Sequence, residues 1–382
     1  MMVNFSGQNF RLGVLGGGQL GRMLLQEAVN LNIATAVIDP DANAPCRFLT
    51  EMFVQGDFRD EETVYNFGKK VNVLTIEIEH VNIRALQRLE SEGVLVLPQP
   101  QVLAMVQDKG LQKEFFISHN IPTAPFHLIH DKSALENHIN SFPAILKLRK
   151  GGYDGKGVMK LKNASSLTNC FDAPCVLEEM IDFEMEIAVI VARNSAGNIV
   201  HYPAVEMEFN PEANLVEFLY SPARINNEIS DKAIAIARKV IEKTGMTGIL
   251  AVEMFVTKKG EVLVNEIAPR PHNSGHQTIE GNITSQYAQQ LRAILGLPLG
   301  ATDIVKPSVM INILGEKGHE GEAHYNGITE VMHLEGVYVH LYGKKMTKPM
   351  RKMGHVTITD NDLTKAIETA RIVLQKLKVQ TQ

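Results

Sequence analysis

Cysteine is scarce in this chain of 382 residues, where the only cysteines are Cys46, Cys170 and Cys175. Three thiols are too few for a disulfide framework, and the spacing of the last two does not fit a zinc knuckle. The sequence therefore predicts reduced, buried thiols in a cytoplasmic protein.

An excess of positive charge is also absent. The 38 lysines and arginines are outnumbered by 43 aspartates and glutamates, which gives a formal net charge of −5. This balance excludes recruitment of nucleic acid or a membrane surface by the overall field of the protein. No apolar run is long enough to span a bilayer, and the first ten residues, MMVNFSGQNF, lack the cationic and apolar regions of a secretory signal. We expect small-molecule partners, and any cationic cluster should bind a local anion.

Short apolar runs alternate with amphipathic stretches over residues 11–98. RLGVLG, IATAVIDP, VNVLTIEIE and VLVLP have the composition of buried strands, and GQLGRMLLQEAVNLN and NIRALQRLESEG that of helices. Alternation of this kind predicts a parallel sheet with helices on its faces.

The pattern changes near residues 99–109. Further strands are expected at PAILKLRK, CVLEEMI, EMEIAVIVA and ILAVEMFV, with a helix that ends at Gly245. A smaller strand-rich segment follows and closes with the helix DLTKAIETARIVLQKL. We predict an α/β protein of three domains: a Rossmann-like parallel-sheet domain over residues 1–103, a central domain over 104–300 and a small α+β domain over 301–382.

A glycine motif lies between the first predicted strand and helix. It contains Gly16, Gly18 and Gly21 in the spacing GxGxxG, and Asp39 ends the next strand. This is the fingerprint of a dinucleotide site, with an acid placed for a ribose hydroxyl. A tight strand-to-helix turn also favours glycine, and a helix N-terminus can hold any phosphate, so the motif alone leaves both interpretations open.

A pair of acids is predicted to face each other across a hairpin. AVEMFV and VLVNEI flank the turn-rich segment TKKGE, and a four-residue loop, residues 258–261, pairs Thr257 with Val262 and therefore Glu253 with Glu266. Opposed like charges are destabilising unless a cation or a shared proton lies between them. Magnesium suits such a pair because it binds few carboxylates and completes its shell with phosphate oxygens and water. The alternative is a frayed hairpin whose acids face water.

A glycine-rich, cationic segment, KLRKGGYDGKGV, occupies residues 147–158. It is not a Walker A loop, because Lys150 replaces the first glycine and Gly157 replaces the serine or threonine. Its glycines allow close approach to phosphates, which Lys147 and Lys156 can neutralise. Alone it could be a solvated turn; together with the acid pair it predicts a site for a magnesium-bound nucleotide.

A third cluster, NEIAPRPHNSGH, follows directly on the second acid. Arg270 is suited to bidentate binding of phosphate or carboxylate, and His272 and Asn273 lie beside it. A structural loop with a satisfied histidine is the alternative interpretation.

The motifs LGGGQLGRM, TIEIEHV, KLRKGGYDGKG, LEEMIDFEMEI, VEMF, NEIAPRPHNSGH and GLPLG occur in that order. The set resembles the ATP-grasp superfamily and, within it, the 5-(carboxyamino)imidazole ribonucleotide synthases, over essentially the whole chain. The resemblance implies a three-domain ATP-grasp fold and a homodimer. It also implies a ligase of purine biosynthesis that joins aminoimidazole ribonucleotide and bicarbonate, using ATP and Mg²⁺, through carboxyphosphate.

The resemblance further implies the residues of the site, which fall into four groups. The ATP contacts are Lys109, Lys147, Gly152, Tyr153, Asp154, Gly155, Lys156, Gly157, Val158, Glu178, Glu179, Met180, Ile181, Glu186, Asn265 and Glu266. The magnesium ligands are Glu253 and Glu266. The ribonucleotide contacts are Gln19, Leu20, Glu77, Tyr153, Arg270, His272, Asn273, Lys344 and Arg351. The catalytic residues are Lys147, Arg270 and His272.

One position departs from the family pattern: Phe209 stands where many members have a histidine near the nucleotide, so no role is assigned there.

Three rival functions are also considered. Formate-dependent phosphoribosylglycinamide formyltransferase shares the PRPH run and the paired acids, but the YDGKG loop and Gln19 in place of a glutamate favour the carboxylating enzyme. An NAD(P)-dependent oxidoreductase would leave the acid pair unexplained, and a nucleotide sensor would bind ATP without releasing phosphate.

Overall fold

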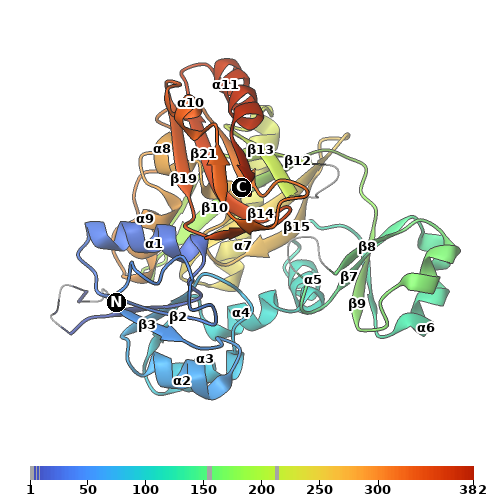
Figure 1. The fold of residues 1–382 in the computed structure, drawn as a ribbon. Coiled ribbons are helices and arrows are strands. Elements are labelled where there is room, and N and C mark those ends of the chain that lie inside the picture. The colour runs from blue at the N-terminus through green and yellow to red at the C-terminus, as the bar shows by residue number, and fades with distance from the viewer. Residues whose placement is uncertain (1–3, 6, 8, 153–156, 211–214) are drawn as a thin grey trace.

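The computed structural model describes residues 4, 5, 7, 9–152, 157–210 and 215–382 (Figure 1). The N-terminal part is a five-stranded parallel sheet in the order β3-β2-β1-β4-β5. Its strands in chain order are β1 Leu12–Leu15, β2 Thr35–Asp39, β3 Met52–Gln55, β4 Val73–Ile76 and β5 Leu95–Val96. The predicted parallel sheet is confirmed.

Helices cover both faces of this sheet. Its helices are α1 Gln19–Asn30, α2 Glu61–Gly68, α3 Ile83–Ser91 and α4 Pro100–Val106. Asp60 and Asn82 accept hydrogen bonds from the first turns of α2 and α3, which satisfies amide groups that have no partner inside the helix. The apolar side of α1 packs on one face together with α9, and α2 and α3 pack on the other. The sheet is therefore buried on both sides, as its continuously apolar strands predict.

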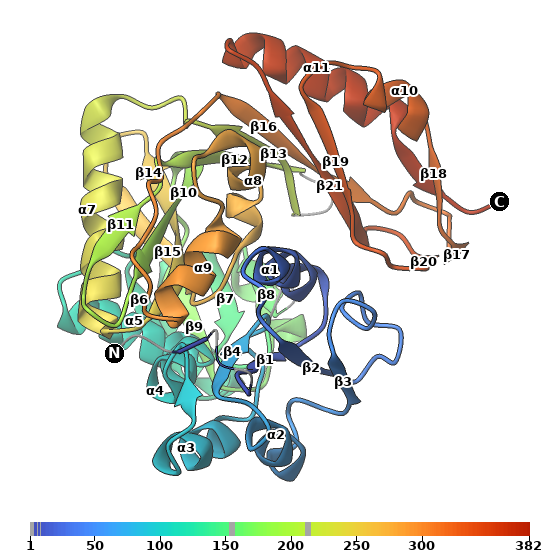
Figure 2. The ribbon, with the colours of Figure 1, turned by 90° about the vertical axis from the view of Figure 1, so that its left-hand side faces the viewer.

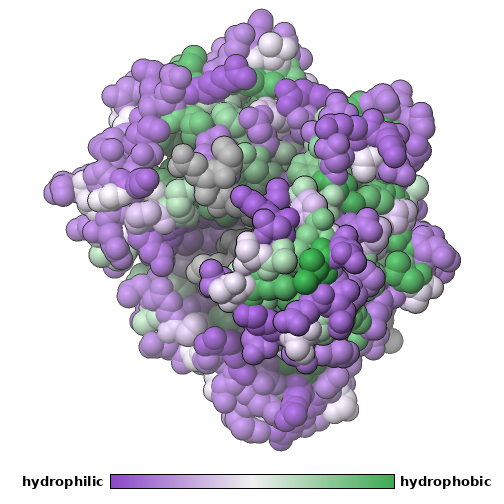
Figure 3. Space-filling view, turned by 90° about the vertical axis from the view of Figure 1, so that its right-hand side faces the viewer, coloured by the Kyte–Doolittle hydropathy of each residue, from purple (hydrophilic) through white to green (hydrophobic). Residues whose placement is uncertain are grey.

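A small antiparallel sheet forms a separate lobe, at the right of Figure 1. Its order is β6-β9-β7-β8, with bounds Phe126–Ile129, Cys175–Glu179, Ala144–Leu148 and Val158–Leu161. Helix α5, Lys109–Ser118, leads into this lobe, and α6, Lys132–Leu135, packs on it. Seen from the side of the small lobe, the surface is largely hydrophilic, with hydrophobic residues gathered around a hollow near its middle (Figure 3).

A nine-stranded antiparallel sheet forms the centre of the molecule. Its order is β15-β14-β10-β12-β13-β16-β21-β19, with β11 beside β10. The bounds are β10 Phe183–Arg193, β11 Ile199–His201, β12 Val205–Asn210, β13 Leu215–Ser221, β14 Gly248–Thr257, β15 Val262–Ala268, β16 Ser308–Leu314, β19 Val337–Leu341 and β21 Lys352–Thr359. The C-terminal strands thus extend the central sheet through the pairing of β13 with β16, and the domain limits near 103 and 300 stay predictions.

The remaining helices and short strands cover or edge this sheet. They are α7 Asn227–Thr244, α8 Thr278–Gly281, α9 Gln286–Ile294, α10 Ile328–Met332, α11 Leu363–Lys376, β17 Gly321–Glu322, β18 His324–Asn326, β20 Met346–Thr347 and β22 Lys378–Gln380. Short 3-10 helices span Glu136–Ser141, Ala164–Asn169 and Asn273–Gly275. Gly245 ends α7 in the left-handed conformation, with φ 63°, as predicted.

Two expectations from composition can be compared with the structure. All three cysteines are free; Cys46 and Cys175 are buried as predicted, whereas Cys170 is only half-buried. Within the part of the chain that the structure describes, every helix is too short or too polar to cross a membrane.

Candidate active site

The predicted acid pair lies in the hairpin of β14 and β15, where Glu253 is directly opposite Glu266. The register beyond the pair differs from the prediction. Val262 pairs with Val256, not with Thr257, whose amide donates a hydrogen bond to the Glu261 carbonyl at 2.9 Å. The predicted register is therefore wrong by one residue next to the turn. A β-bulge in β15 inserts one residue and restores the pairing of the two acids.

The bulge also decides which side chains face the site. Val264 and Ile267 are buried in the core, whereas Asn265 and Glu266 between them are both half-buried. Strict alternation would have sent neighbouring residues to opposite faces of the sheet. At a bulge, two residues oppose one, so an amide and a carboxylate can lie side by side on one face. The break in the alternation of VLVNEI is the sequence signal for this arrangement.

Two lysines from other elements meet this face of the hairpin. Lys109 is the first residue of α5, and its Nζ lies 2.8 Å from Oε2 of Glu266. Lys147 belongs to β7 of the small lobe, and its Nζ lies 2.8 Å from Oδ1 of Asn265 and 3.0 Å from Oε2 of Glu178. Two predicted phosphate contacts and both predicted magnesium ligands are thus brought together.

The acids have unequal proton affinities. Burial, followed by the charges of Glu266 and Glu186, raises the pKa of Glu253 to about 8. Lys109 lowers the pKa of Glu266 to about 2. Burial also raises the pKa of Glu186, on β10, to about 7. Glu253 is therefore the acid of the pair that loses its proton less readily, and a cation at its carboxylate would favour the ionised form.

The donor set fits a magnesium ion bound with a nucleotide. The two carboxylates are hard oxygen ligands, and the amide oxygen of Asn265 adjoins them. The residues that the structure describes contain no group of three or more His, Cys, Asp or Glu side chains that could hold a metal by themselves. An ion that takes one or two carboxylates and completes its shell with phosphate oxygens and water matches this set.

The segment after Glu266 connects the hairpin to the N-terminal domain. Arg270 forms an ion pair with Glu79, with Nε 2.8 Å from Oε1. Nε2 of His272 lies 3.4 Å from Oε1 of Glu253, and the His272 backbone exchanges two hydrogen bonds of 2.8 Å with the side chain of Gln286. These contacts place His272 beside Glu253 of the acid pair, and Arg270 beside Glu79 of the N-terminal domain.

The glycine motif is filled by carboxylates of the chain itself. The Gly21 amide donates to Oε2 of Glu77 at 2.8 Å, and the Gly17 amide donates to Oδ2 of Asp39 at 2.7 Å. A side chain added at Gly18 would overlap the carboxylate of Glu77. The amides that bind a pyrophosphate in dinucleotide proteins are engaged here, and Asp39 holds the turn, which contradicts the dinucleotide hypothesis.

Two of the predicted ribonucleotide residues, Gln19 and Lys344, meet where α1 faces the C-terminal segment. Nζ of Lys344 lies 2.9 Å from Oε1 of Gln19, the first residue of α1, and 2.7 Å from the carbonyl of Lys352. Arg351 donates to the Met346 carbonyl at 2.8 Å. The structure therefore brings Gln19 and Lys344 together from opposite ends of the chain, in the region where α1 faces β19 and β21 (Figure 2).

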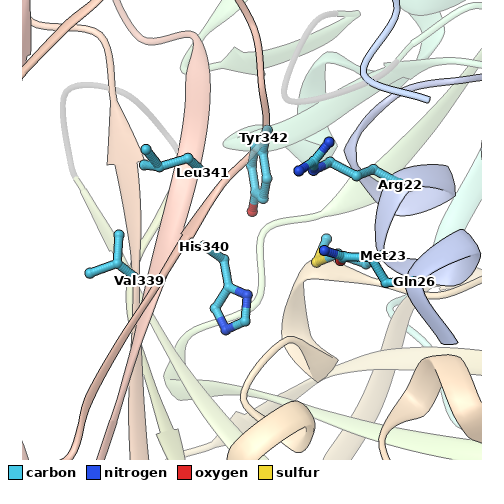
Figure 4. Close-up of a pocket in the computed structure, with 7 residues that line it drawn as sticks. All are labelled: Arg22, Met23, Gln26, Val339, His340, Leu341 and Tyr342. Atoms are coloured by element: carbon cyan, nitrogen blue, oxygen red, sulfur yellow. The ribbon is translucent and has the colours of Figure 1, made fainter. Parts of the chain in front are cut away.

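Other predicted positions lie nearby or serve the fold. Leu20 packs against the core between α1 and α9, and Asn273 begins a 3-10 helix capped by His272. A cavity of about 290 Å³ opens between α1 and β19, and no predicted site residue lines it (Figure 4). Its lining residues are Arg22, Met23, Gln26, Val339, His340, Leu341 and Tyr342.

The stretch predicted to hold the adenine begins with the last two residues of β9 and continues beyond its end. Glu178 is 4% exposed, whereas Glu179 and Met180 are exposed and Ile181 is half-buried. The carboxylate of Glu178 is enclosed by Lys147 and by Lys113, a residue that the sequence analysis missed.

Part of the glycine-rich loop lies outside the described residues, namely Tyr153, Asp154, Gly155 and Lys156. On either side, the loop joins strands β7 and β8: Lys147 pairs with Val158, and the Leu148 amide donates to the Gly157 carbonyl at 2.8 Å. The described residues of the loop, including Gly152, lead from strand to strand, which agrees with the absence of a Walker A motif.

Two further residues, Lys352 and Glu79, were given no role in the sequence analysis. Burial raises the pKa of Glu253, and the charges of Lys109 and Lys352 act against that shift. Glu79, the partner of Arg270, lies two residues after Glu77, whose carboxylate accepts a hydrogen bond from the glycine turn.

Phe209 packs against the apolar cluster of Val205 and Met207, which gives it a structural role.

Three family descriptions match successive parts of the chain. Residues 10–107 match the ribonucleotide synthetase preATP-grasp domain, residues 114–287 the ATP-grasp domain, and residues 308–369 the phosphoribosylaminoimidazole carboxylase C-terminal domain. Together they give the three-domain ATP-grasp architecture that the sequence analysis predicts.

Relatives match over almost the whole chain. The N5-carboxyaminoimidazole ribonucleotide synthase of Bacillus subtilis is 36% identical, over 91% of this chain and 90% of the relative. The crystal structure of the corresponding synthetase from Thermotoga maritima is 41% identical, with a TM-score of 0.89 and coverage of 98% of this chain and 100% of that chain. A structure from Aspergillus clavatus, in complex with ADP and 5-aminoimidazole ribonucleotide, is 33% identical, with a TM-score of 0.86 and coverage of 96% and 98%.

Some relatives are longer. The chain is 38% identical to a chloroplastic phosphoribosylaminoimidazole carboxylase of Vigna aconitifolia but spans only 66% of its length. The match to the bacterial synthase and to the Thermotoga structure covers nine tenths or more of both partners. The chain therefore belongs to the N5-carboxyaminoimidazole ribonucleotide synthetase family of the ATP-grasp superfamily.

Proposed function

We propose that the chain carboxylates 5-aminoimidazole ribonucleotide: ATP, bicarbonate and the ribonucleotide give 5-(carboxyamino)imidazole ribonucleotide, ADP and phosphate. The observation that carries this proposal is the hairpin face on which Glu253 and Glu266 meet two lysines, Lys109 and Lys147, from other elements. The complex of the Aspergillus relative with ADP and the ribonucleotide supports the substrate assignment.

The lysines would bind the phosphates of ATP. Lys109 and Lys147 now donate to Glu266, Asn265 and Glu178, so their ammonium groups are already held at the acid hairpin. Glu253 and Glu266 would hold Mg²⁺, which, when bound, offsets the negative charge that develops on the transferred phosphoryl group. Preorganised cations of this kind stabilise phosphoryl transfer because they need no rearrangement during the reaction.

Two steps then carry the carboxyl group. A bicarbonate oxygen attacks the γ-phosphorus and ADP leaves, which gives carboxyphosphate. The amine of the ribonucleotide takes up the carboxyl carbon, phosphate leaves, and the amine loses a proton. Arg270 and His272 would hold the carboxyphosphate, since His272 lies beside Glu253 and Arg270 belongs to the same segment, four residues after Glu266. The loop of residues 152–158 would cover the phosphates and exclude water, as the family resemblance implies.

The ribonucleotide would lie between the N-terminus of α1 and the C-terminal segment. The hydrogen bond between Lys344 and Gln19 supports this placement, because it joins the two groups of residues predicted to contact the sugar phosphate. Glu77 shapes the turn before α1 by accepting a hydrogen bond from Gly21.

The test is ADP release with bicarbonate, with and without aminoimidazole ribonucleotide. We expect release that depends on bicarbonate and accelerates with the ribonucleotide. Formate with glycinamide ribonucleotide is the control for the related formyltransferase. Phosphate release with that pair alone, or ATP binding without any release, would overturn the proposal.

We also propose that the protein is a cytoplasmic homodimer, as the family resemblance implies. Light scattering coupled to gel filtration checks the assembly, and a mass near the 42.3 kDa of one chain would contradict it.

A further inference from the structure

A buried lysine, Lys113, lies behind the proposed phosphate site. Its residue is 2% exposed, in the second turn of α5. Its Nζ lies 2.6 Å from Oγ1 of Thr123 and 3.2 Å from Oε1 of Glu178, and it faces the ring of Phe126 at 5.9 Å. A lysine is almost never buried unless its charge is paired, so these contacts require an explanation.

Both contacts of Lys113 lead to the same second lysine. Along one arm, the other oxygen of Glu178 lies 3.0 Å from Nζ of Lys147. Along the other arm, Thr123 donates to the Val264 carbonyl at 2.8 Å, and the next residue, Asn265, accepts from Nζ of Lys147 at 2.8 Å. The contacts therefore form a closed ring from Lys113 to Lys147 and back.

The ring joins two lobes of the molecule. Glu178 and Lys147 lie on β9 and β7 of the small four-stranded sheet, whereas Val264 and Asn265 lie on β15, an edge strand of the nine-stranded sheet. Thr123 forms an isolated β-bridge with Val264 beside the bulge. The acid hairpin and the small lobe are thus tied together at the point where Lys147 reaches across.

We propose, on the basis of the function proposed above, that Lys113 is a positioning residue that sets Lys147 at the acid hairpin through Glu178 and Thr123. Lys113 does not touch the hairpin acids in this arrangement. It holds the Glu178 carboxylate from one side, so that the other oxygen is presented to Lys147, and it holds the Thr123 hydroxyl against the strand that carries the bulge.

Charge balance supports this assignment. Glu178 is shared by two ammonium groups, and its attraction opposes the effect of burial on Lys113. Burial, together with the charges of Lys147 and Lys109, still lowers the pKa of Lys113, to about 8. Burying a lysine costs free energy because its charge loses contact with water, so stability alone does not explain Lys113. A role in fixing the position of a second cation, Lys147, does explain it.

The test compares Lys113→Met, Lys113→Arg and Thr123→Val with the full-length protein and with Lys160→Met, which removes an exposed lysine of β8 in the same lobe. Binding of ADP with Mg²⁺ is measured by calorimetry, and KM for ATP and for the ribonucleotide by ADP release. We expect Lys113→Met to weaken ADP binding and raise KM for ATP by about tenfold or more, with KM for the ribonucleotide within about twofold of the native value.

The other two variants separate the contribution of Thr123 from that of the charge of Lys113. Thr123→Val breaks one arm of the ring and should raise KM for ATP by roughly three- to tenfold, while Lys113→Arg should recover part of the loss because it keeps the charge. Folded Lys113→Met and Thr123→Val proteins with native ADP affinity would overturn the proposal. So would an equal change in the KM of both substrates. If Lys113→Met does not fold, Thr123→Val decides by the same criteria.

Failure of the proposed function is a separate outcome. A native protein that releases no ADP in the presence of bicarbonate would refute the carboxylation, but the calorimetric comparison would still test the role of Lys113. Native release of ADP with unchanged affinity in the variants would refute the role of Lys113 alone.

Discussion

Replacing Glu253 with glutamine should remove activity and, without metal and nucleotide, stabilise the fold at alkaline pH. Directly opposed side chains have β-carbons roughly 5 Å apart, and two carboxylates at such a distance repel by about 3 kcal/mol at an effective dielectric constant of about 20. Part of this repulsion is offset by Lys109 and Lys352. We therefore expect a gain of about 1–3 kcal/mol in the free energy of unfolding.

The difference in stability between Glu253→Gln and the native protein depends on pH. The pKa of Glu253 is raised from 4.5 to about 8 in the folded protein by burial and by Glu266. An acid whose pKa is raised on folding costs stability above its unfolded pKa, and the cost grows until the folded pKa is passed. The native protein and Glu253→Gln should therefore have similar stability near pH 4.5, and the variant should be more stable at pH 8.

The assay is urea unfolding at a series of pH values with a chelator present, repeated with Mg²⁺ and ADP. Ligands should stabilise the native protein but hardly affect Glu253→Gln. Glu266→Gln is the control: it leaves Lys109 without its partner and should lower stability by roughly 1 kcal/mol near pH 5, where Glu253 is protonated and the two acids do not repel each other. A Glu253→Gln protein that is less stable than native at pH 8, or that keeps bicarbonate-dependent ADP release, would refute the reasoning.

Three further predictions concern other parts of the site. Gly18→Ala places a methyl group onto the Glu77 carboxylate, so it should raise KM for the ribonucleotide at least tenfold and leave KM for ATP unchanged. The kinetic control is Gly7→Ala, because the carbon added there meets no atom closer than 3.6 Å. Arg270→Lys loses the guanidinium group that is paired with Glu79 and should lower kcat for bicarbonate-dependent release by about tenfold or more, while calorimetry finds ADP affinity unchanged. Removing divalent cations with EDTA should abolish ADP release, and Mg²⁺ should restore it; activity that persists in EDTA would contradict the role of the acid pair.

Much of the fold follows from patterns that the sequence displays directly. Short apolar strands alternating with amphipathic helices predict the parallel sheet, and helix α7 ends before Gly245 because a left-handed residue stops it there. The extension of the central sheet by β16, β21 and β19 was not predicted. Which strand edges meet depends on pairing between segments nearly ninety residues apart, such as Tyr220 and Val309, and composition carries no information about that choice.

Contacts in the site could be predicted between residues that are close in sequence, but not between residues on distant segments. The pairing of Glu253 with Glu266 follows from a short loop, although the bulge that makes it possible did not enter the prediction. Lys113 resembles any polar residue of an amphipathic helix, because its partners Glu178 and Thr123 lie on other segments. A buried cation becomes visible only when the tertiary structure shows what surrounds it.

The glycine turn shows why a local motif can suggest the wrong ligand. The spacing of Gly16, Gly18 and Gly21 specifies backbone amides directed toward a negative group at the start of a helix. It does not specify whether that group comes from a ligand or from the protein. Here Glu77 and Asp39 supply it, and burial raises the pKa of both carboxyls against the effect of the amide hydrogen bonds. Because carboxylates of the protein already accept the hydrogen bonds of the turn, a ligand at this end of α1 must be recognised by side chains such as Gln19, which is hydrogen-bonded to Lys344. The ligand can therefore differ from that of the dinucleotide proteins although the backbone motif is the same.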